Sequence, residues 1–435
     1  MAGCRGAAGA IASGSVTCPA VSDAVAVESP LRLEDAPVAA LLQAERTRQA
    51  ESLCLIASEN HCSAAVRLAC ASVITDKYAE GYPGARYYGG CEIADQIEEL
   101  ARSRARQLFG VPFANVQPHS GTTANLAALA ALARAGDPIL GMALNAGGHL
   151  SHGFKVSHTG QFFSAHQYGV RPDTGLIDLD QVADLARKHR PKVLIAGASS
   201  YPRAVPWREL RAIADEVGAA LLADIAHPAG LMAVGVMPSP VGIADVVTMT
   251  THKTLRGPRG GMILTTRPEL AEKIDKSVFP GGQGGPLMHQ IAGKAVAFGE
   301  ALRPEFADYQ RRVLANAQRL ASRMVERGLT VVTGGTDCHM VVVSLVGRDI
   351  TGAEVEQRAL AAGITLNKNM VPGDPRSPRV TSGIRLGTPA VTSRGLGLAE
   401  MDQLADVLVG LISGRDPESY RGLVRELAGR FPLPG

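Results

Sequence analysis

A lysine and an aspartate that lie 29 residues apart are the clearest candidates for chemistry in this sequence of 435 residues. Lys253 follows an apolar run in VVTMTTHKTLRGPRGG, and Asp224 closes the apolar run LLAD. A carboxylate at the end of a buried strand is costly unless a partner compensates its charge. Pyridoxal phosphate offers such a partner in its protonated ring nitrogen, and it also requires a lysine that forms a Schiff base. The two residues together therefore predict a pyridoxal-phosphate site, although Lys253 alone would suit a solvated loop.

A short polar segment is a candidate binding site for the phosphate of that cofactor. In PHSGTTANLAAL, the residues Ser120, Gly121 and Thr122 stand directly before a predicted helix. The amide groups at a helix N-terminus, together with the helix dipole, bind phosphate groups. The same residues also suit an ordinary helix N-cap, and it is their occurrence together with Asp224 and Lys253 that favours the phosphate.

The elements that must position these residues follow from an alternation of short apolar runs and amphipathic segments between residues 92 and 300. We predict strands at 139–142, 193–196, 220–224, 246–250 and 262–265, and helices at 93–108, 124–133, 179–189, 207–217 and 287–302. Such alternation is typical of βαβ units, which form a mostly parallel sheet with helices on both faces. Asp224 and Lys253 then lie at the carboxyl ends of neighbouring strands, where α/β sheets bind ligands.

The two ends of the chain differ from this central region. Residues 1–32 are rich in Ala, Gly, Ser and Val and predict a disordered extension. An amphipathic helix is expected from about 33 to 55. Beyond residue 304 we predict a second α+β unit, with helices at 309–327, 353–362, 399–413 and 417–429 and strands at 330–332 and 340–345. The expected organisation is a large α/β domain over 33–303 and a smaller C-terminal domain over 304–435.

Composition excludes several classes of function. The formal net charge is +3, and Lys and Arg are interspersed with Asp and Glu, which argues against a nucleic-acid partner. No run of about 18 apolar residues occurs, so we expect no membrane span. The seven cysteines form no C-x-x-C pair, so we expect reduced thiols, no metal site and a cytoplasmic protein. The N-terminal segment lacks the continuous apolar core of a secretory signal.

Nine sequence strings, in order between about residues 33 and 413, resemble the serine hydroxymethyltransferase family. They are LIASEN, KYAEGYPGARYYGG, VQPHSGTTAN, GGHLSHG, DIAHPAGL, TTHKTLRGPRGG, FPGGQGGP, GGTDCH and SGIRLGTPA. The resemblance implies a fold-type-I pyridoxal-phosphate transferase, with a mostly parallel seven-stranded sheet in its large domain. It also implies a homodimer, or a tetramer built from two dimers, whose active sites lie at the subunit interface. The implied reaction is the reversible conversion of L-serine and tetrahydrofolate into glycine and methylenetetrahydrofolate.

The same resemblance implies roles for individual residues. For the cofactor, Lys253 would bind it covalently, Asp224 would pair with the ring nitrogen, and His149 would stack on the ring. The ring oxygen would be held by Ser199 and His227, and the phosphate by the helix-start residues, His252 and, from the partner subunit, Gly285. Tyr78, Glu80 and Tyr88 would also cross the interface, with Tyr78 binding the cofactor, Glu80 as general acid or base, and Tyr88 as a further catalytic residue. The substrate would be bound by Ser58, Glu80, Tyr87, Tyr88 and Arg385, and folate by Leu144, Gly148, His149, Leu150, Asn369, Arg376, Ser377 and Pro378.

Simpler interpretations of these residues stay open at this point. Arg385 lies between Ile384 and Leu386, and a buried guanidinium there needs an anion, which could be a structural Asp or Glu as well as a substrate carboxylate. Glu80 could be a solvated turn carboxylate, and the tyrosines could only pack an interface. His149, without the resemblance, would be an ordinary loop histidine.

Five positions differ from the residues usual in the family, and they bear on the folate region and on substrate choice. They are His61, Ala146, Gly373, Arg379 and Leu396. The alternative is therefore a relative that acts on another β-hydroxy amino acid, such as an α-methylserine hydroxymethyltransferase, a threonine-type aldolase or a transaldolase. A third hypothesis, a chain that binds a partner or RNA without turnover, is disfavoured by the intact candidate catalytic residues and the balanced charge.

Overall fold

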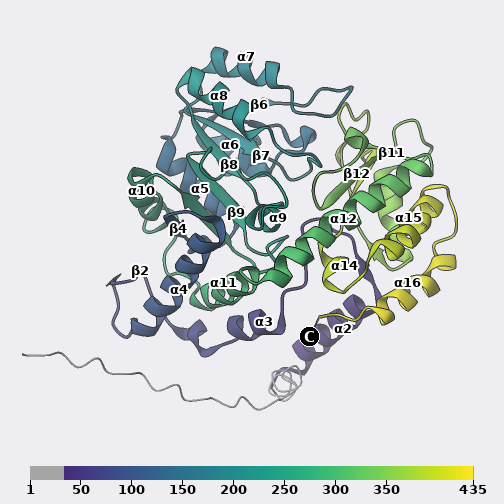
Figure 1. Ribbon diagram of the computed structural model, residues 1–435, viewed down its shortest axis with the longest axis horizontal. Helices are drawn as coiled ribbons and strands as arrows, with labels where there is room; N and C mark the ends of the chain where they lie inside the picture. The colour runs from purple at the N-terminus through teal and green to yellow at the C-terminus, as the bar shows by residue number, and fades with distance from the viewer. Residues whose placement is uncertain (1–33, 435) are drawn as a thin grey trace, which may run out of the picture. The chain divides into compact units, whose positions relative to one another are not determined.

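The computed structural model describes residues 34–434, and the chain divides into the units Met1–Gln49 and Ala50–Gly435 (Figure 1). The predicted disordered extension, residues 1–32, lies outside the described residues. Helix α2 spans Ala36–Glu51, so the helix expected over 33–55 ends earlier than predicted. Leu53 and Leu55 leave the helix because both are fully buried, and Leu53 begins strand β1 (Leu53–Cys54), which pairs with β13 (Ile364–Thr365).

A seven-stranded sheet forms the centre of the larger unit, in the order β4-β10-β9-β8-β7-β5-β6. Of these seven strands, β10 alone runs opposite to the other six, so the mostly parallel sheet is confirmed. The strands are β4 (Phe113–Asn115), β5 (Pro138–Met142), β6 (Ser164–Tyr168), β7 (Val193–Gly197), β8 (Ala220–Asp224), β9 (Val246–Thr250) and β10 (Gly261–Thr265). The strands β4 and β6 were not predicted, because one has three residues and the other, SAHQY, contains no apolar run.

Helices cover both faces of this sheet, and the side chains of each strand alternate between two cores. In β7, Val193 and Ile195 join the core under α5 and α10, whereas Leu194 and Ala196 join the core under the helices of the opposite face. Burial on both faces explains why the central strands are continuous apolar runs. The helices are α4 (Glu92–Phe109), α5 (Gly121–Leu132), α7 (Leu179–His189), α8 (Trp207–Val217), α10 (Pro268–Val278) and α11 (Met288–Ala301).

A second sheet, antiparallel and ordered β11-β12-β15-β14, lies in the C-terminal part of the chain. Its strands are β11 (Thr330–Val331), β12 (Met340–Ser344), β14 (Asn367–Lys368) and β15 (Gly383–Gly387), and its core is shared with α13 (Gly352–Ala361), α15 (Leu398–Ile412) and α16 (Glu418–Arg430). Helix α12 (Pro304–Glu326) begins five residues before the predicted start. In Figure 1 it runs from beside α11 to α15, and it contributes Phe306 to one core and Leu320 to the other. A domain boundary near residue 304 stays a prediction.

Short elements complete the described chain. They are α3 (Ala64–Cys70), η1 (Val73–Asp76), β2 (Gly81–Tyr82), β3 (Ala85–Arg86), η2 (Leu144–Ala146), η3 (Leu150–His152), α6 (His158–Phe162), α9 (Ala229–Ala233), η4 (Val332–Gly334) and α14 (Pro389–Ser393). Among the helices that the structure describes, none combines the length and the apolar character that crossing a bilayer requires.

Candidate active site

Asp224 and Lys253 come from neighbouring parallel strands, as predicted. Strand β8 ends at Asp224, which lies opposite Thr248 of β9, and Lys253 follows the end of β9 by three residues. The two residues are 7% and 9% exposed. Two buried groups of opposite charge thus lie at the carboxyl edge of the sheet, where a ligand is expected.

Asp224 is held by three hydrogen-bond donors. Its Oδ2 accepts from Asn125 Nδ2 at 2.8 Å and from His152 Nε2 at 2.9 Å, and its Oδ1 accepts from the backbone amide of Ala226 at 2.9 Å. Burial by itself would raise the pKa of Asp224, but its hydrogen bond with His152, with further contributions from His149 and Asn125, holds that pKa well below its usual range. The carboxylate is therefore an anion that can keep a nearby ring nitrogen protonated.

His152 is a site residue to which the sequence analysis gave no role. Its Nδ1 accepts the backbone N–H of His149 at 3.3 Å, so Nε2 carries the proton that is donated to Asp224. The ring is fully buried. The signal was present in the sequence, because His152 lies in the string GGHLSHG, three residues after His149.

Asn125 was missed as well, and it joins the carboxylate to its surroundings. Its amide nitrogen donates to Ser151 Oγ as well as to Asp224, both at 2.8 Å, and its oxygen accepts from Thr248. Ser151 Oγ lies 2.7 Å from Nδ1 of His149. The orientations of Asp224 and His149 are therefore set by one hydrogen-bond network.

Lys253 has the properties of a reactive amine. Burial lowers its pKa to about 8, the nearby Asp224 opposes this shift, and the positive charges of Arg385 and Arg259 add to it. A larger fraction of its amine is therefore neutral near pH 7 than in a solvated lysine. The carbonyl of Lys253 accepts from Asn60 Nδ2 at 2.9 Å, and Asn60 also donates to the hydroxyl of Tyr309. Asn60 belongs to the string LIASEN, but its contact with Lys253 could not be predicted from the sequence.

His149 lies in a turn that only glycines can form. Gly147 has φ 105°, and a Cβ on it would come within 2.6 Å of the carbonyl oxygen of Ser200. A Cβ on Gly148 would lie 2.0 Å from the carbonyl oxygen of Met142. Burial, with smaller effects from the positive charges around it, lowers the pKa of His149 to about 4, although Asp224 opposes the shift. The imidazole is thus neutral and suited to stacking on a flat ring.

The predicted phosphate residues surround the start of α5. Ser120 is the N-cap of this helix: its Oγ accepts from the amide of Thr123 at 3.1 Å, which supports the N-cap interpretation for that side chain. Gly121 is required, because a Cβ there would lie 2.7 Å from Cγ2 of Thr250. Thr122 is exposed at the same helix start. His252 approaches from the lysine loop, and its buried Nδ1 has no hydrogen-bond partner among the described residues.

Arg385, in the middle of β15, is a half-buried cation that has no carboxylate partner among the described residues. Its Nη1 donates to the carbonyl of Ser199 at 2.6 Å and its Nε to Asn367 Oδ1 at 3.2 Å. Burial lowers its pKa to about 10. Within residues 34–434, no Asp or Glu forms an ion pair with it, so the structural-anion interpretation finds no partner there. Ser58 follows Ala57, and Ala57 packs directly against Gly387 at the end of the same strand.

His227 and Ser199 are placed at the same edge of the sheet. His227 is 2% exposed, and its ring stacks on His339 with centroids 5.4 Å apart. Burial, and then the charges of Lys253 and Arg385, place the pKa of His227 far below its usual range. Ser199 donates its amide to the carbonyl of Gly147 at 2.8 Å, which joins it to the turn of His149.

Tyr78, Glu80 and Tyr88 form a separate group on the loop that contains β2 and β3. The hydroxyl of Tyr78 donates to Glu80 Oε1 at 3.3 Å, and the rings of Tyr78 and Tyr88 lie 5.0 Å apart, edge to face. Gly285 belongs to this group, because a Cβ on it would be 3.2 Å from the ring of Tyr78. Tyr87 is 73% exposed and contacts Phe279. In the described part of the chain, no hydrogen bond, ion pair or ring contact joins this group to Asp224 or Lys253.

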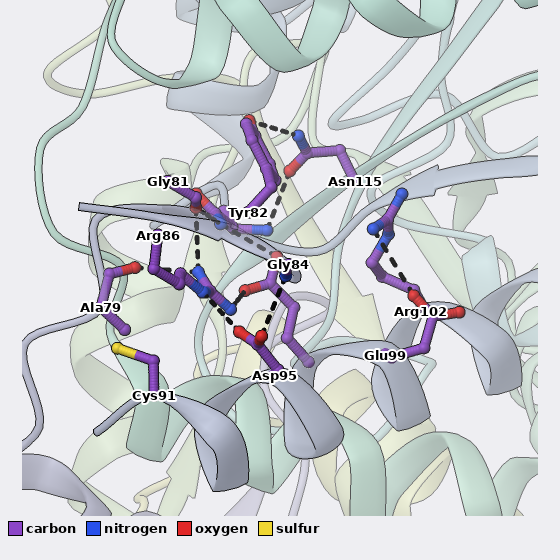
Figure 2. A network of polar contacts seen from close by, with 12 residues as sticks. Ala79, Gly81, Tyr82, Gly84, Arg86, Cys91, Asp95, Glu99, Arg102 and Asn115 are labelled. Atoms are coloured by element: carbon purple, nitrogen blue, oxygen red, sulfur yellow. Dashed lines mark hydrogen bonds and ion pairs between the residues drawn. The ribbon is translucent and has the colours of Figure 1, made fainter. Parts of the chain in front are cut away.

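A buried arginine fixes the loop that carries Glu80 (Figure 2). The Nη1 of Arg86 donates to the carbonyls of Ala79 and Gly81, at 2.8 and 2.9 Å, which flank Glu80 on both sides. Its Nε bonds to Asp95 and its Nη2 to Glu98, both on α4. The position of Glu80 therefore depends on a guanidinium that is only 4% exposed.

The predicted folate residues lie on two loops. Leu144 and Leu150, on either side of the Gly147–Gly148–His149 turn, are 39% and 49% exposed, so their apolar side chains are accessible. Asn369 donates its backbone amide to the carbonyl of Gly383. The Nη1 of Arg376 donates to the carbonyl of Ile350, in the segment before α13, at 2.7 Å, while Ser377 and Pro378 are both exposed.

The chain is similar in sequence to known proteins over most of its length. The family model of serine hydroxymethyltransferase matches residues 31–408. A serine hydroxymethyltransferase of Teredinibacter turnerae is 53% identical over 90% of this chain and 94% of its own length. Serine hydroxymethyltransferase 1 of Rhodospirillum rubrum is 55% identical over 93% of this chain and 95% of its own length. Serine hydroxymethyltransferase 1 of Pseudomonas fluorescens is 54% identical over 92% of this chain and 98% of its own length.

The chain belongs to the serine hydroxymethyltransferase family. This is a family of pyridoxal-phosphate transferases of fold type I, as the sequence strings indicated. The residues of this site fit the cofactor: Asp224 is anionic, Lys253 has a lowered pKa, and the buried Nδ1 of His252 lacks a partner in the described chain. One departure from the serine hydroxymethyltransferase pattern, Leu396, is 1% exposed and belongs to the core of the second sheet, so it does not bear on the site.

Proposed function

We propose that this chain transfers the hydroxymethyl group of L-serine to tetrahydrofolate, giving glycine and methylenetetrahydrofolate, in a reversible reaction of one-carbon metabolism. The observation that carries the proposal is the convergence of three charges, of which Asp224 and Lys253 are buried and Arg385 is half-buried: the pKa of Lys253, about 8, is influenced by both Asp224 and Arg385. A lysine, a carboxylate and a carboxylate-binding guanidinium are what a pyridoxal-phosphate enzyme acting on an amino acid requires.

Lys253, Asp224, His149, Ser199 and His227 would hold the cofactor ring, and the start of α5 with His252 would hold its phosphate. When bound, pyridoxal phosphate supplies an electron sink for the electron pair released when the Cα–Cβ bond of serine breaks. Asp224 keeps a proton on the ring nitrogen through its own charge. His149, neutral at pH 7, covers the ring without adding a charge that would oppose that proton.

The amino acid would be bound through its carboxylate. Arg385 presents a rigid guanidinium, of which Nη1 and Nε are oriented by Ser199 and Asn367, and a carboxylate can accept two charge-assisted hydrogen bonds from such a group. Ser58 would add a hydroxyl donor.

Glu80 would move the proton of the serine hydroxyl. In this proposal the chain is a homodimer, and Glu80, Tyr78, Tyr87, Tyr88 and Gly285 complete the site of the partner subunit. Two observations support it: the group lies apart from Lys253, and large apolar side chains in and next to its loop are exposed, among them Val73, Tyr87 and Ile93 at 87%, 73% and 61%. Further assembly into a tetramer is compatible with the same dimer.

We also propose a cytoplasmic location, because the five cysteines within the described residues are free thiols.

Tetrahydrofolate would lie against Leu144, Gly148, His149 and Leu150, with Asn369 and the segment Arg376, Ser377 and Pro378 on the other side. The exposed leucines offer the apolar contact that a pterin ring prefers. The one-carbon acceptor would thus meet the amino acid next to His149.

The test is a comparison of initial rates with L-serine, with and without tetrahydrofolate, beside α-methylserine and allo-threonine. We expect serine turnover that depends on tetrahydrofolate and exceeds the rates with the other two amino acids. Preferred turnover of α-methylserine, or cleavage of β-hydroxy amino acids that folate does not stimulate, would contradict the proposal and favour a transferase or aldolase of different substrate choice.

A further inference from the structure

A buried lysine on α11 lies close to the candidate phosphate site and has no role in the proposed function. Lys294 is 1% exposed and stands in the middle of the helix. Burying an ammonium group is costly unless each of its three hydrogens has an acceptor. The hydrogen-bond acceptors of Lys294 therefore show which segments of the chain its ammonium group holds together.

All three acceptors are backbone carbonyls of the segments that surround the phosphate residues. The Nζ of Lys294 donates to Val116 at 2.6 Å, to Gly261 at 2.8 Å and to Pro118 at 3.1 Å. Val116 and Pro118 lie between β4 and the N-cap Ser120, whereas Gly261 begins β10, after the lysine loop. The ammonium thus joins two segments that are more than 100 residues apart in the sequence.

These two segments are packed against each other at the same point. The amide of Gly261 donates to the carbonyl of Pro118 at 2.8 Å, and a Cβ on Gly261 would lie 2.2 Å from the carbonyl oxygen of Ser120. On the other side, the carbonyl of Gly260 accepts from the amide of Thr251 at 3.1 Å, directly before His252. Lys294 therefore contacts both segments that carry the candidate phosphate residues, the one that leads to Ser120 and the one that follows the loop of His252.

The charge of Lys294 has a clear physical use in this place. Burial lowers its pKa to about 7, while the negative charge of Glu98 opposes this shift. Three carbonyl oxygens facing its three hydrogens favour the ammonium form. Carbonyl oxygens carry partial negative charge and would repel a phosphate nearby, so the ammonium that binds them removes part of that repulsion.

We propose that Lys294 is a positioning residue for the cofactor phosphate: its ammonium fixes the Ser120–Gly121 segment against the His252 loop and offsets the carbonyl charge behind them. The inference rests on the proposed function, since it concerns the phosphate of the same cofactor. It differs from a purely structural role in one respect, because it predicts a loss of affinity that depends on the phosphate group of the ligand.

The test uses two ligands that differ only in that group, pyridoxal phosphate and pyridoxal, and the variant Lys294→Met, which keeps an unbranched side chain one atom shorter and removes the charge. Dissociation constants are measured by equilibrium titration of the full-length apoprotein. We expect pyridoxal phosphate to bind about tenfold more weakly or worse, on the scale of one lost charge-assisted hydrogen bond. Pyridoxal binding should change by less than about twofold.

Two control variants separate this effect from a general loss of stability. Lys276→Met removes an exposed lysine that pairs with Glu272 on α10 and should leave both dissociation constants unchanged. Leu320→Ala weakens the core of the second sheet, away from the phosphate residues, and should lower stability without changing the ratio of the two constants.

A second variant tests the same contact if Lys294→Met does not fold. A Cβ in Gly260→Ala would lie 2.4 Å from Cε and 2.9 Å from Nζ of Lys294, so it displaces the ammonium without removing it. The same selective loss of pyridoxal phosphate is expected. Equal losses for the two ligands, or no loss for either, in the variants that fold would overturn the inference. If the unmodified chain bound no pyridoxal phosphate at Lys253, the proposed function itself would fail.

Discussion

Replacement of Arg86 by methionine should destabilise the protein in a way that depends on pH. The guanidinium makes four hydrogen bonds, to Asp95, Glu98 and the carbonyls of Ala79 and Gly81 (Figure 2). Glu98 is 1% exposed and, among the residues that the structure describes, would keep only Gln117 as a hydrogen-bond partner. Breaking a buried ion pair by removing one member costs about 3–5 kcal/mol, because the other charge stays buried without compensation. That is a large part of the stability of a typical domain.

The dependence on pH follows from Glu98. Burial raises its pKa in the intact protein, and Arg86 is the strongest opposing influence, so the variant should raise that pKa further. Between the pKa of the unfolded chain, about 4.3, and the raised value, the folded state then binds a proton that the unfolded state lacks. Stability of the variant should therefore fall as pH rises through this window, and the penalty should shrink toward acid pH.

The assay is urea unfolding of Arg86→Met and the unmodified protein between mildly acidic and neutral pH. The second change Glu98→Gln, added to Arg86→Met, removes the unpaired charge and should recover much of the loss. Arg421→Met is the matched control, because the ion pair of Arg421 with Glu418 within α16 is exposed and 3.5 Å long, and should cost less than about 1 kcal/mol. A penalty that does not vary with pH, or that Glu98→Gln fails to reduce, would refute the reasoning.

Three further predictions concern turnover. Glu80→Gln should lower kcat with serine and tetrahydrofolate by about 10²-fold or more, the scale of a lost general acid or base, while glycine binding is kept; a near-normal rate would leave Glu80 as an interface residue. Arg385→Ala should raise KM for serine by about 10²-fold or more, because a carboxylate loses two charge-assisted bonds, and an unchanged KM would exclude it from substrate binding. Asn369→Ala should reduce the folate-stimulated exchange of the glycine α-proton, measured by NMR, and leave the folate-independent cleavage of allo-threonine unchanged. Equal effects on the two rates would argue against a contact between Asn369 and folate.

The sequence predicted the sheet best where its strands are buried on both faces. Asp224 and Lys253 could be placed because β8 and β9 are continuous apolar runs whose ends are unambiguous. Strand β15 was not predicted, since its five residues, GIRLG, carry Arg385 at the centre and glycine at both ends. That arginine breaks the apolar run for a reason that only its three-dimensional surroundings reveal.

The polar partners of the site were harder to predict than the groups that they support. Asn125 reaches Asp224 from 99 residues away and Asn60 reaches Lys253 from 193 residues away, and no local spacing signals either contact. His152 is the intermediate case: it stands in a string that pointed to His149, but its role depends on which nitrogen carries the proton. For Ser120, the N-cap and the phosphate-binding interpretations are compatible. Its side chain caps α5, and the helix amides at the same place are free to bind an anion.

The protonation states of the site form one consistent arrangement. Burial dominates the lowered pKa values of His149 and His252, about 4 and about 3, so both rings are neutral at physiological pH. The charged groups around Lys253 include the buried anion Asp224 and the half-buried cation Arg385. The proposed reaction needs two anionic ligand groups, a phosphate ester and an amino-acid carboxylate. The phosphate would meet the N-terminus of α5, and the carboxylate would meet Arg385, which has no carboxylate partner in the described chain. Neutral imidazoles are what such a site requires, because protonated ones would compete with the ring nitrogen for the single carboxylate that keeps it charged.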